Sequence, residues 1–125
     1  MSNEILWEEQ GACWRFYGNV SLQDIQKIHS AFFGDARFDD QKYLIVDFGG
    51  AEKVDVSKDE PVVFAAIDTV AAKSNPYMHL AVVAKTKEIK ELVSIYVTNS
   101  PWETKVFENI EDARIRIKEK LKKLL

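Results

Sequence analysis

Two nearly continuous apolar runs constrain the fold of this chain more than any other feature. One spans residues 43–46, Tyr-Leu-Ile-Val, and the other spans residues 78–84, Met-His-Leu-Ala-Val-Val-Ala. A strand with one face in water alternates apolar and polar side chains, whereas these runs are typical of strands covered on both faces. Such strands occur in parallel sheets flanked by helices, so the chain is predicted to be an α/β protein.

Three further strands are predicted from shorter patterns. Residues 5–9 are a short strand candidate, and the alternation across residues 12–20 predicts a second strand that forms an antiparallel hairpin with the first. Residues 105–107 predict a short strand at an edge of the sheet, because lysine is one of the residues that blunt exposed edges.

Helical spacing of apolar residues predicts four helices. Ser21 is expected to cap the first helix, residues 21–33, with Asp24 three positions later. The other three are expected over residues 59–74, 86–99 and 109–124.

The apolar stripes of two helices predict their buried faces. In the second helix the stripe, widened by Phe64, is Val63, Ala66, Ile67, Val70, Ala71 and Ser74. We expect this stripe to face the sheet. In the last helix the stripe is Ile110, Ala113, Ile117, Leu121 and Leu124. The cations of the last helix suit its C-terminal end, and binding to an anionic membrane surface is the alternative.

The predicted order of elements is ββαβαβαβα. Strands that alternate with helices after an initial hairpin imply a mixed, mostly parallel sheet flanked by helices and joined by right-handed crossovers. At 125 residues the whole chain, residues 1–125, is expected to form a single domain.

Composition excludes several classes of function. A net charge of −3 lacks the basic surplus that is typical of nucleic-acid binding. A lone cysteine, Cys13, cannot form an internal disulfide, and no spacing of histidine and cysteine matches a metal site. No signal peptide or spanning segment is predicted, so we expect a cytoplasmic protein that is not an integral membrane protein. No cofactor and no catalytic constellation are predicted, so an enzyme is not expected.

The segment after the first apolar run is the predicted functional end of the molecule. In open α/β sheets, ligands and partners dock at the carboxyl ends of parallel strands. Asp47 interrupts the run, Gly49 and Gly50 are predicted to stop the strand, and a charged loop would then carry Asp55 and Ser57. Asp47 is a candidate ligand group, although a carboxylate that accepts backbone amides of the Gly-Gly turn is the commoner arrangement.

Ser57 allows two interpretations. Together with Glu60 it fits a capping box, which is a structural role. Pro61 argues against that role, because proline lacks the N–H that an interior helical position needs. With Asp59 as the cap, Pro61 falls in the first turn and Ser57 stays free on the loop.

The remaining candidate residues are histidines and aromatics. His29 is expected to be half exposed on the flank of the first helix, and His79 to be a core histidine with satisfied hydrogen bonds. Aromatic residues exceed what the core stripes require, and those proposed to line a pocket or a homodimer surface are Tyr17, Phe33, Tyr96 and Trp102. The alternative is that they pack beneath loops.

The chain resembles the small SpoIIAA-like proteins of the STAS/Sec14-like group, which share the fold of anti-anti-sigma factors. The residues that carry this resemblance are Phe38-Asp39-Asp40, residues 43–48, residues 54–57, Ser74-Asn75-Pro76, residues 81–83, Tyr96, Ser100-Pro101-Trp102 and Phe107. The resemblance implies a non-catalytic domain that works through contacts with protein partners.

The resemblance also points to a switch residue. In anti-anti-sigma factors an Asp-Ser-Ser-Gly segment carries a serine that a partner kinase phosphorylates. Asp55 and Ser57 match the aspartate and the phosphorylated serine, while Val56 and Lys58 stand where the family has serine and glycine.

Two functions are therefore expected from the sequence. The first is a regulatory protein-interaction module, switched at Ser57, with a kinase-like protein among its potential partners. The alternative, implied by the Sec14-like resemblance and the aromatic surplus, is a carrier or sensor of a small apolar ligand or lipid.

Overall fold

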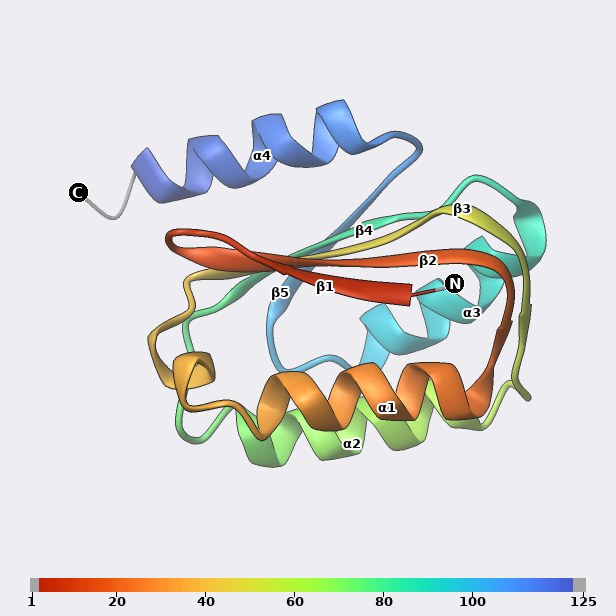
Figure 1. Cartoon of the computed structure of the whole chain (residues 1–125), viewed down its shortest axis with the longest axis horizontal. Helices are drawn as coiled ribbons and strands as arrows, with labels where there is room; N and C mark the ends of the chain where they lie inside the picture. The colour runs from red at the N-terminus through yellow and green to blue at the C-terminus, as the bar shows by residue number, and fades with distance from the viewer. Residues whose placement is uncertain (1–2, 123–125) are drawn as a thin grey trace.

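The computed structural model describes residues 3–122 as one five-stranded sheet with helices on both faces (Figure 1). The strands are β1 (Asn3–Trp7), β2 (Gly11–Ser21), β3 (Tyr43–Asp55), β4 (His79–Val83) and β5 (Glu103–Phe107). They lie side by side in sequence order, with β1 antiparallel to β2 and all other neighbours parallel. The predicted α/β class and mixed, mostly parallel sheet are confirmed.

The helices divide unequally between the two faces of the sheet. They are α1 (Leu22–Phe33), α2 (Glu60–Ala71), α3 (Lys87–Asn99) and α4 (Ile110–Lys122), with a short 3₁₀ helix, η1 (Ala36–Asp40), after α1. From β2 to β5 each crossover steps to the next strand in the same direction. Right-handed crossovers therefore put α1, α2 and α3 on one face, while α4 covers the other (Figure 1).

Alternate residues of the first apolar run enter two separate cores. Leu44 and Val46 belong to the larger core beneath α1–α3, and Tyr43 and Ile45 belong to the smaller core beneath α4. Successive side chains of a strand point to opposite faces, so a strand with helices on both sides needs apolar residues at every position. This arrangement accounts for the unbroken apolar run.

Side-chain caps start α1 and α3 where the sequence predicts them. Ser21 Oγ accepts the Asp24 N–H at 3.1 Å, and Asp24 Oδ2 accepts the Ser21 N–H at 2.9 Å, which completes a capping box. Thr86 Oγ1 likewise accepts the Ile89 N–H at 3.2 Å at the start of α3. Leu124 of the predicted last helix lies outside the described residues.

The prediction that Gly49 and Gly50 stop the strand is wrong. β3 continues through both glycines and pairs with β2 as far as Asp55. The glycines leave room for side chains, because a Cβ at Gly49 would lie 2.8 Å from Asp47 Oδ1 and one at Gly50 would lie 2.6 Å from the Tyr17 ring. The expected long loop is therefore reduced to residues 56–59.

The predicted buried face of α2 is wrong at Val63, Ile67 and Val70, whereas Ala71 of the predicted stripe does pack against the larger core. The helix buries Pro61, Ala65 and Asp68. Its exposed side chains are Val62 at 46%, Val63 at 49%, Ile67 at 47% and Val70 at 67% of their surface. Apolar residues surround most of this helix, so spacing alone does not select a face. The tertiary partners of Asp68, described below, decide the orientation.

A charged clamp holds α4 against the opposite face of the sheet. Arg114 of α4 donates from both terminal nitrogens to the Glu8 carboxylate, at 2.6 and 2.7 Å, and the Tyr43 hydroxyl donates to the same carboxylate. The hydrogen bond from Arg114 holds the pKa of Glu8 below its ordinary value. Beneath this clamp, Ala113 and Ile117 are buried against the sheet. Within residues 3–122, no helix combines the length and the apolar character needed to cross a membrane.

The clamp predicts a stability change that depends on pH. Arg114→Gln should lower the free energy of unfolding by about 1 kcal/mol near pH 7, because it removes a bidentate contact that solvent screens only in part. The pKa of Glu8 is depressed in the folded state, so the contribution is present above the ordinary glutamate pKa and is lost as the pH falls through the lower folded value.

Urea unfolding of both proteins across the acidic range measures this difference. Arg116→Gln is the matched control. Arg116 lies on the same helix as Arg114, but it pairs with the exposed Glu103 of β5, so its loss should change the stability less. A constant difference between Arg114→Gln and the parent protein at every pH would contradict the assignment to Glu8.

Candidate functional site

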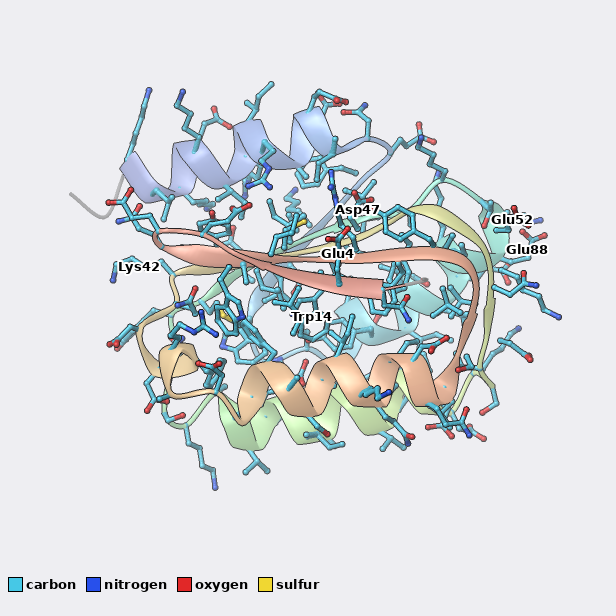
Figure 2. The ribbon with its side chains drawn as sticks, viewed as in Figure 1. Glu4, Trp14, Lys42, Asp47, Glu52 and Glu88 are labelled. Carbon is cyan, nitrogen blue, oxygen red and sulfur yellow. The ribbon has the colours of Figure 1, made fainter. Side chains whose placement is uncertain are left out.

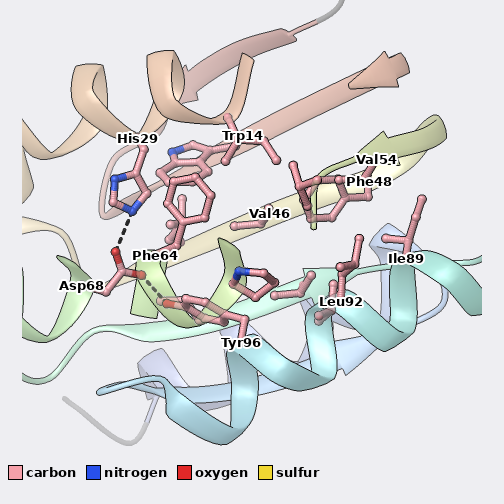
Figure 3. A pocket seen from close by; sticks show the side chains of 17 residues that line it. Trp14, His29, Val46, Phe48, Val54, Phe64, Asp68, Ile89, Leu92 and Tyr96 are labelled. Carbon is pink, nitrogen blue, oxygen red and sulfur yellow. Dashed lines mark hydrogen bonds and ion pairs between the residues drawn. The ribbon is translucent and has the colours of Figure 1, made fainter. Parts of the chain in front are cut away.

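A cavity of about 100 Å³ lies between the sheet and the three helices α1, α2 and α3 (Figure 3). Its sheet side is formed by residues of β2, β3 and β4, among them Trp14, Val46 and Val82. Its helix side includes Phe64 of α2 and Leu92 of α3. Most of the lining is apolar, and the cavity separates the inner face of α2 from the centre of the sheet.

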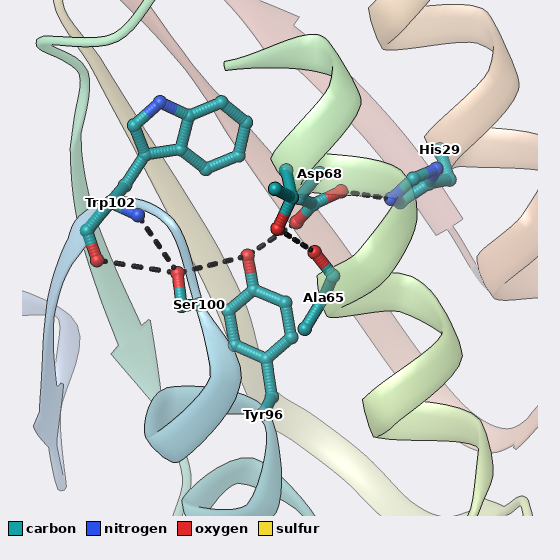
Figure 4. A network of polar contacts seen from close by, with 7 residues as sticks. His29, Ala65, Asp68, Tyr96, Ser100 and Trp102 are labelled. Atoms are coloured by element: carbon teal, nitrogen blue, oxygen red, sulfur yellow. Dashed lines mark hydrogen bonds and ion pairs between the residues drawn. The ribbon is translucent and has the colours of Figure 1, made fainter. Parts of the chain in front are cut away.

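Three polar side chains meet at one end of this cavity. Asp68 of α2 is only 4% exposed, and its Oδ1 lies 2.7 Å from His29 Nε2 of α1. Its second oxygen accepts the hydroxyl of Tyr96 of α3 (Figure 4). A carboxylate oxygen only accepts, so we assign the proton of the first contact to His29 Nε2. One buried carboxylate thus joins the three helices.

The chain of polar contacts continues beyond Tyr96. Ser100 Oγ donates to the Tyr96 oxygen at 3.4 Å and accepts the Trp102 N–H at 3.2 Å (Figure 4). Burial, with the nearby charge of Asp68, raises the pKa of Tyr96 well above that of a free tyrosine. The phenol therefore stays protonated at neutral pH and keeps donating to the carboxylate.

The expectation that His29 is half exposed is wrong, because the side chain is only 7% exposed. It turns towards α2 to reach a carboxylate 39 positions away in the sequence. Asp68 was not among the predicted site residues. It is the only charged residue between Glu60 and Lys73, and an isolated aspartate in an apolar helix is a signal that could have identified it.

The second histidine differs from its prediction in another way. Within the described part of the chain, the buried His79 Nδ1 has no hydrogen-bond partner, and it lies 3.8 Å from Glu103 Oε2. The expected satisfied core histidine is therefore not observed. Burial lowers its pKa, so the ring is neutral at neutral pH.

The four predicted pocket aromatics occupy different places. Tyr96 lines the cavity. Phe33 and Trp102 stack on each other at 6.1 Å beside it, and the Trp102 indole donates to the Asn75 carbonyl at 2.8 Å. Tyr17 is far from this group: it is 37% exposed, its ring lies over Gly50, and its hydroxyl donates to Glu4.

The predicted switch residues lie near the start of α2. Asp55 ends β3, Ser57 is exposed in the connection, and Asp59 precedes the first helical residue without a side-chain cap bond. The Ser57 carbonyl accepts the Glu60 N–H at 3.1 Å, and its hydroxyl has no hydrogen-bond partner within residues 3–122. The arrangement with Pro61 in the first turn is the one expected when Ser57 is not the cap.

Asp47 is separated from these residues. Its Oδ1 accepts the Gly49 N–H at 2.7 Å, which is the structural arrangement favoured from the sequence. The side chain lies on the α4 side of the sheet, opposite Trp14 (Figure 2). Eight strand residues, or roughly 25 Å, separate it from Asp55. The structure therefore does not bring Asp47 together with Ser57.

Neither a metal centre nor an activated cysteine is found in the part of the chain that the structure describes. No group of three or more histidine, cysteine, aspartate or glutamate side chains in residues 3–122 is placed to hold a metal ion. Burial raises the pKa of Cys13 to about 11, so its thiol is protonated and a poor nucleophile at neutral pH.

Solved structures with a similar fold include the following two molecules. The anti-sigma factor antagonist SpoIIAA, in its unphosphorylated form, has a TM-score of 0.64 and 9% sequence identity, over 92% of this chain and 96% of that chain. A protein of the DUF3478 family from Shewanella loihica PV-4, with a SpoIIAA-like fold, has a TM-score of 0.55 and 12% identity, over 93% of this chain and 92% of that chain. No family model and no curated protein matches the sequence. The resemblance inferred from the sequence is confirmed at the level of architecture: the chain has a SpoIIAA-like fold.

Proposed function

We propose that this chain is a non-catalytic regulatory module that binds a protein partner through the exposed face of α2 and the adjoining residues 56–59. The observation that carries the proposal is the exposed apolar face of α2, namely Val62, Val63, Ile67 and Val70. Contiguous apolar surface of this kind is typical of protein-interaction sites. The structural likeness to an anti-sigma factor antagonist supports the same class of function.

The charges at the end of this face suggest the character of the partner. Asp55, Asp59 and Glu60 surround the exposed Ser57, and Lys58 is the one cation among residues 55–60. A partner with an apolar groove for α2 and a basic rim near residues 55–60 would complement both features. A kinase-like regulatory protein of the anti-sigma type fits this description.

The exposed face of α2 predicts the effect of a charge placed on it. Ile67→Glu should lower the affinity for the partner at least tenfold, because it buries an unpaired carboxylate in an apolar contact. The partner is captured from extracts of the source organism and identified by mass spectrometry. Its affinity for each variant is then measured with the purified partner.

Ile115→Glu is the matched control for this prediction. Ile115 is 58% exposed on α4, on the opposite face of the molecule. Thermal unfolding should show that both variants are as stable as the parent protein, since both side chains are exposed. Equal affinity of Ile67→Glu and the parent protein for the partner would contradict the proposed surface.

The switch version of the proposal predicts phosphorylation at Ser57. Protein isolated from its own cells should carry phosphate on Ser57, detected by peptide mass spectrometry, while Ser94, exposed on α3 with its hydroxyl bonded to the Glu91 carbonyl, should be unmodified. Ser57→Asp should strengthen partner binding, because it adds negative charge opposite the proposed basic rim of the partner. Unmodified Ser57 under all growth conditions, with unchanged binding by Ser57→Asp, would rule out the switch but not the interaction module.

The second candidate function is a carrier or sensor of a small apolar ligand. The observation that favours it is the cavity beneath α2, with a polar cluster at one end of an otherwise apolar lining. Pockets that bind small molecules commonly combine an apolar wall with a few converging polar groups.

A further inference from the structure

We propose that the cavity beneath α2 binds a small, uncharged aromatic molecule that carries a hydroxyl group, of the phenol class, rather than a lipid. This inference rests on the second candidate function and specifies the ligand of that site. Four properties of the cavity lead to it: its volume, its aromatic wall, its charge, and an unsatisfied hydrogen-bond donor at its polar end.

The volume selects a ligand of about one ring. The cavity holds about 100 Å³, and an engineered protein cavity of roughly 150 Å³ accommodates benzene. The lining residues Val56, Phe64 and Leu92 are only partly buried, so they can move outwards to complete the space. A long acyl chain contains several times the atoms of benzene and does not fit.

The wall of the cavity favours a flat apolar body. Trp14, Phe48 and Phe64 contribute aromatic rings, and aliphatic side chains such as Val46 fill the space between them (Figure 3). Aromatic rings gain from edge-to-face and offset contacts beyond the area that they bury. A ligand ring has such partners on more than one side.

The polar end of the cavity contains a donor without an acceptor. Only 5% of the Trp14 surface is exposed, and its indole Nε1–H has no hydrogen-bond partner within residues 3–122. Figure 3 shows Trp14 beside His29, at the end where Asp68 lies. A buried unpaired donor typically costs about 1–3 kcal/mol of folding free energy. A ligand that supplies an acceptor would remove this cost and so bind more tightly. A hydroxyl oxygen can accept from the indole.

The charge of the site excludes an anion. The residues that line the cavity include no lysine and no arginine, and Asp68 brings a carboxylate that already bonds to His29 and Tyr96. A ligand carboxylate would be buried beside this group without a cation to pair with, which is strongly unfavourable. A neutral hydroxyl avoids that penalty, and it can donate to a remaining lone pair of Asp68.

The test is binding of four probes to the purified full chain, measured by calorimetry and by NMR of the indole N–H signals. Phenol should bind several-fold more tightly than benzene, and benzoate and octanoate should not bind at the same concentrations. The Trp14 indole N–H signal should shift downfield with phenol and shift less with benzene, because only phenol supplies an acceptor. Trp7 and Trp102 do not line the cavity, so their signals are internal controls.

Two kinds of variant test separately the hydrogen bond from the Trp14 indole and the volume of the cavity. Trp14→Phe keeps a ring but removes the donor, so it should reduce the preference for phenol over benzene and leave only the part that donation to Asp68 supports. Trp7→Phe, outside the cavity, should change neither affinity. Val82→Phe should abolish binding of both molecules by filling the cavity, and Leu92→Phe on the partly exposed wall serves the same purpose if Val82→Phe does not fold.

The outcomes of these experiments distinguish the proposed ligand class from the carrier or sensor function on which it rests. Binding of octanoate or benzoate in place of phenol would overturn the ligand class and leave a carrier function standing. Failure of all four probes to bind would overturn both the proposed ligand class and the carrier function. A preference for phenol that Trp14→Phe leaves unchanged would overturn the role of the indole. Ile67→Glu should bind phenol normally, so the ligand test is independent of the protein-interaction surface.

Discussion

One buried carboxylate, Asp68, fixes the arrangement of the cavity face. It accepts from His29 of α1 and from Tyr96 of α3, so all three helices on this face meet at a single side chain. A buried pair of this kind is a weak source of net stability, but removing one partner typically costs about 3–5 kcal/mol because the other charge is left unsatisfied. The network therefore specifies which face of α2 turns inward more than it strengthens the fold.

The orientation of α2 explains both candidate sites at once. With Asp68 turned inward, Pro61, Phe64 and Ala65 occupy the inner side and the valine-rich side is left in solvent. The inner side is not filled completely, and the cavity is the space that remains between α2 and the sheet. The exposed face proposed for a protein partner and the cavity proposed for a small ligand are thus two sides of one helix.

Local patterns of the sequence were sufficient for the framework of the fold. Two continuous apolar runs predicted the doubly covered strands, and Ser21 with Asp24 predicted the start of α1, because each signal depends only on neighbours along the chain. The length of β3 was not predictable in this way. Gly49 and Gly50 are needed because side chains from other positions approach them closely, and glycine in a strand resembles a turn signal until those partners are known.

The site was harder to predict than the fold for the same reason. His29 and Asp68 are 39 positions apart, and neither residue alone carries a motif, so their pairing follows only from the packing of α1 against α2. Of the aromatic residues proposed from the sequence, Tyr96 lines the cavity, whereas Phe33 and Trp102 stack on each other. The excess of aromatic residues in the sequence does not separate these two cases.

The cavity lies close to the carboxyl end of β3, where the sequence predicted that ligands and partners dock. The sheet side of the cavity is lined by Leu44 and Val46 of β3 and by Leu80 and Val82 of β4. Val54 and Val56, which are partly exposed, line it where β3 ends and residues 56–59 begin. The cavity therefore extends from the buried Asp68 carboxylate, at its polar end, towards the carboxyl end of β3.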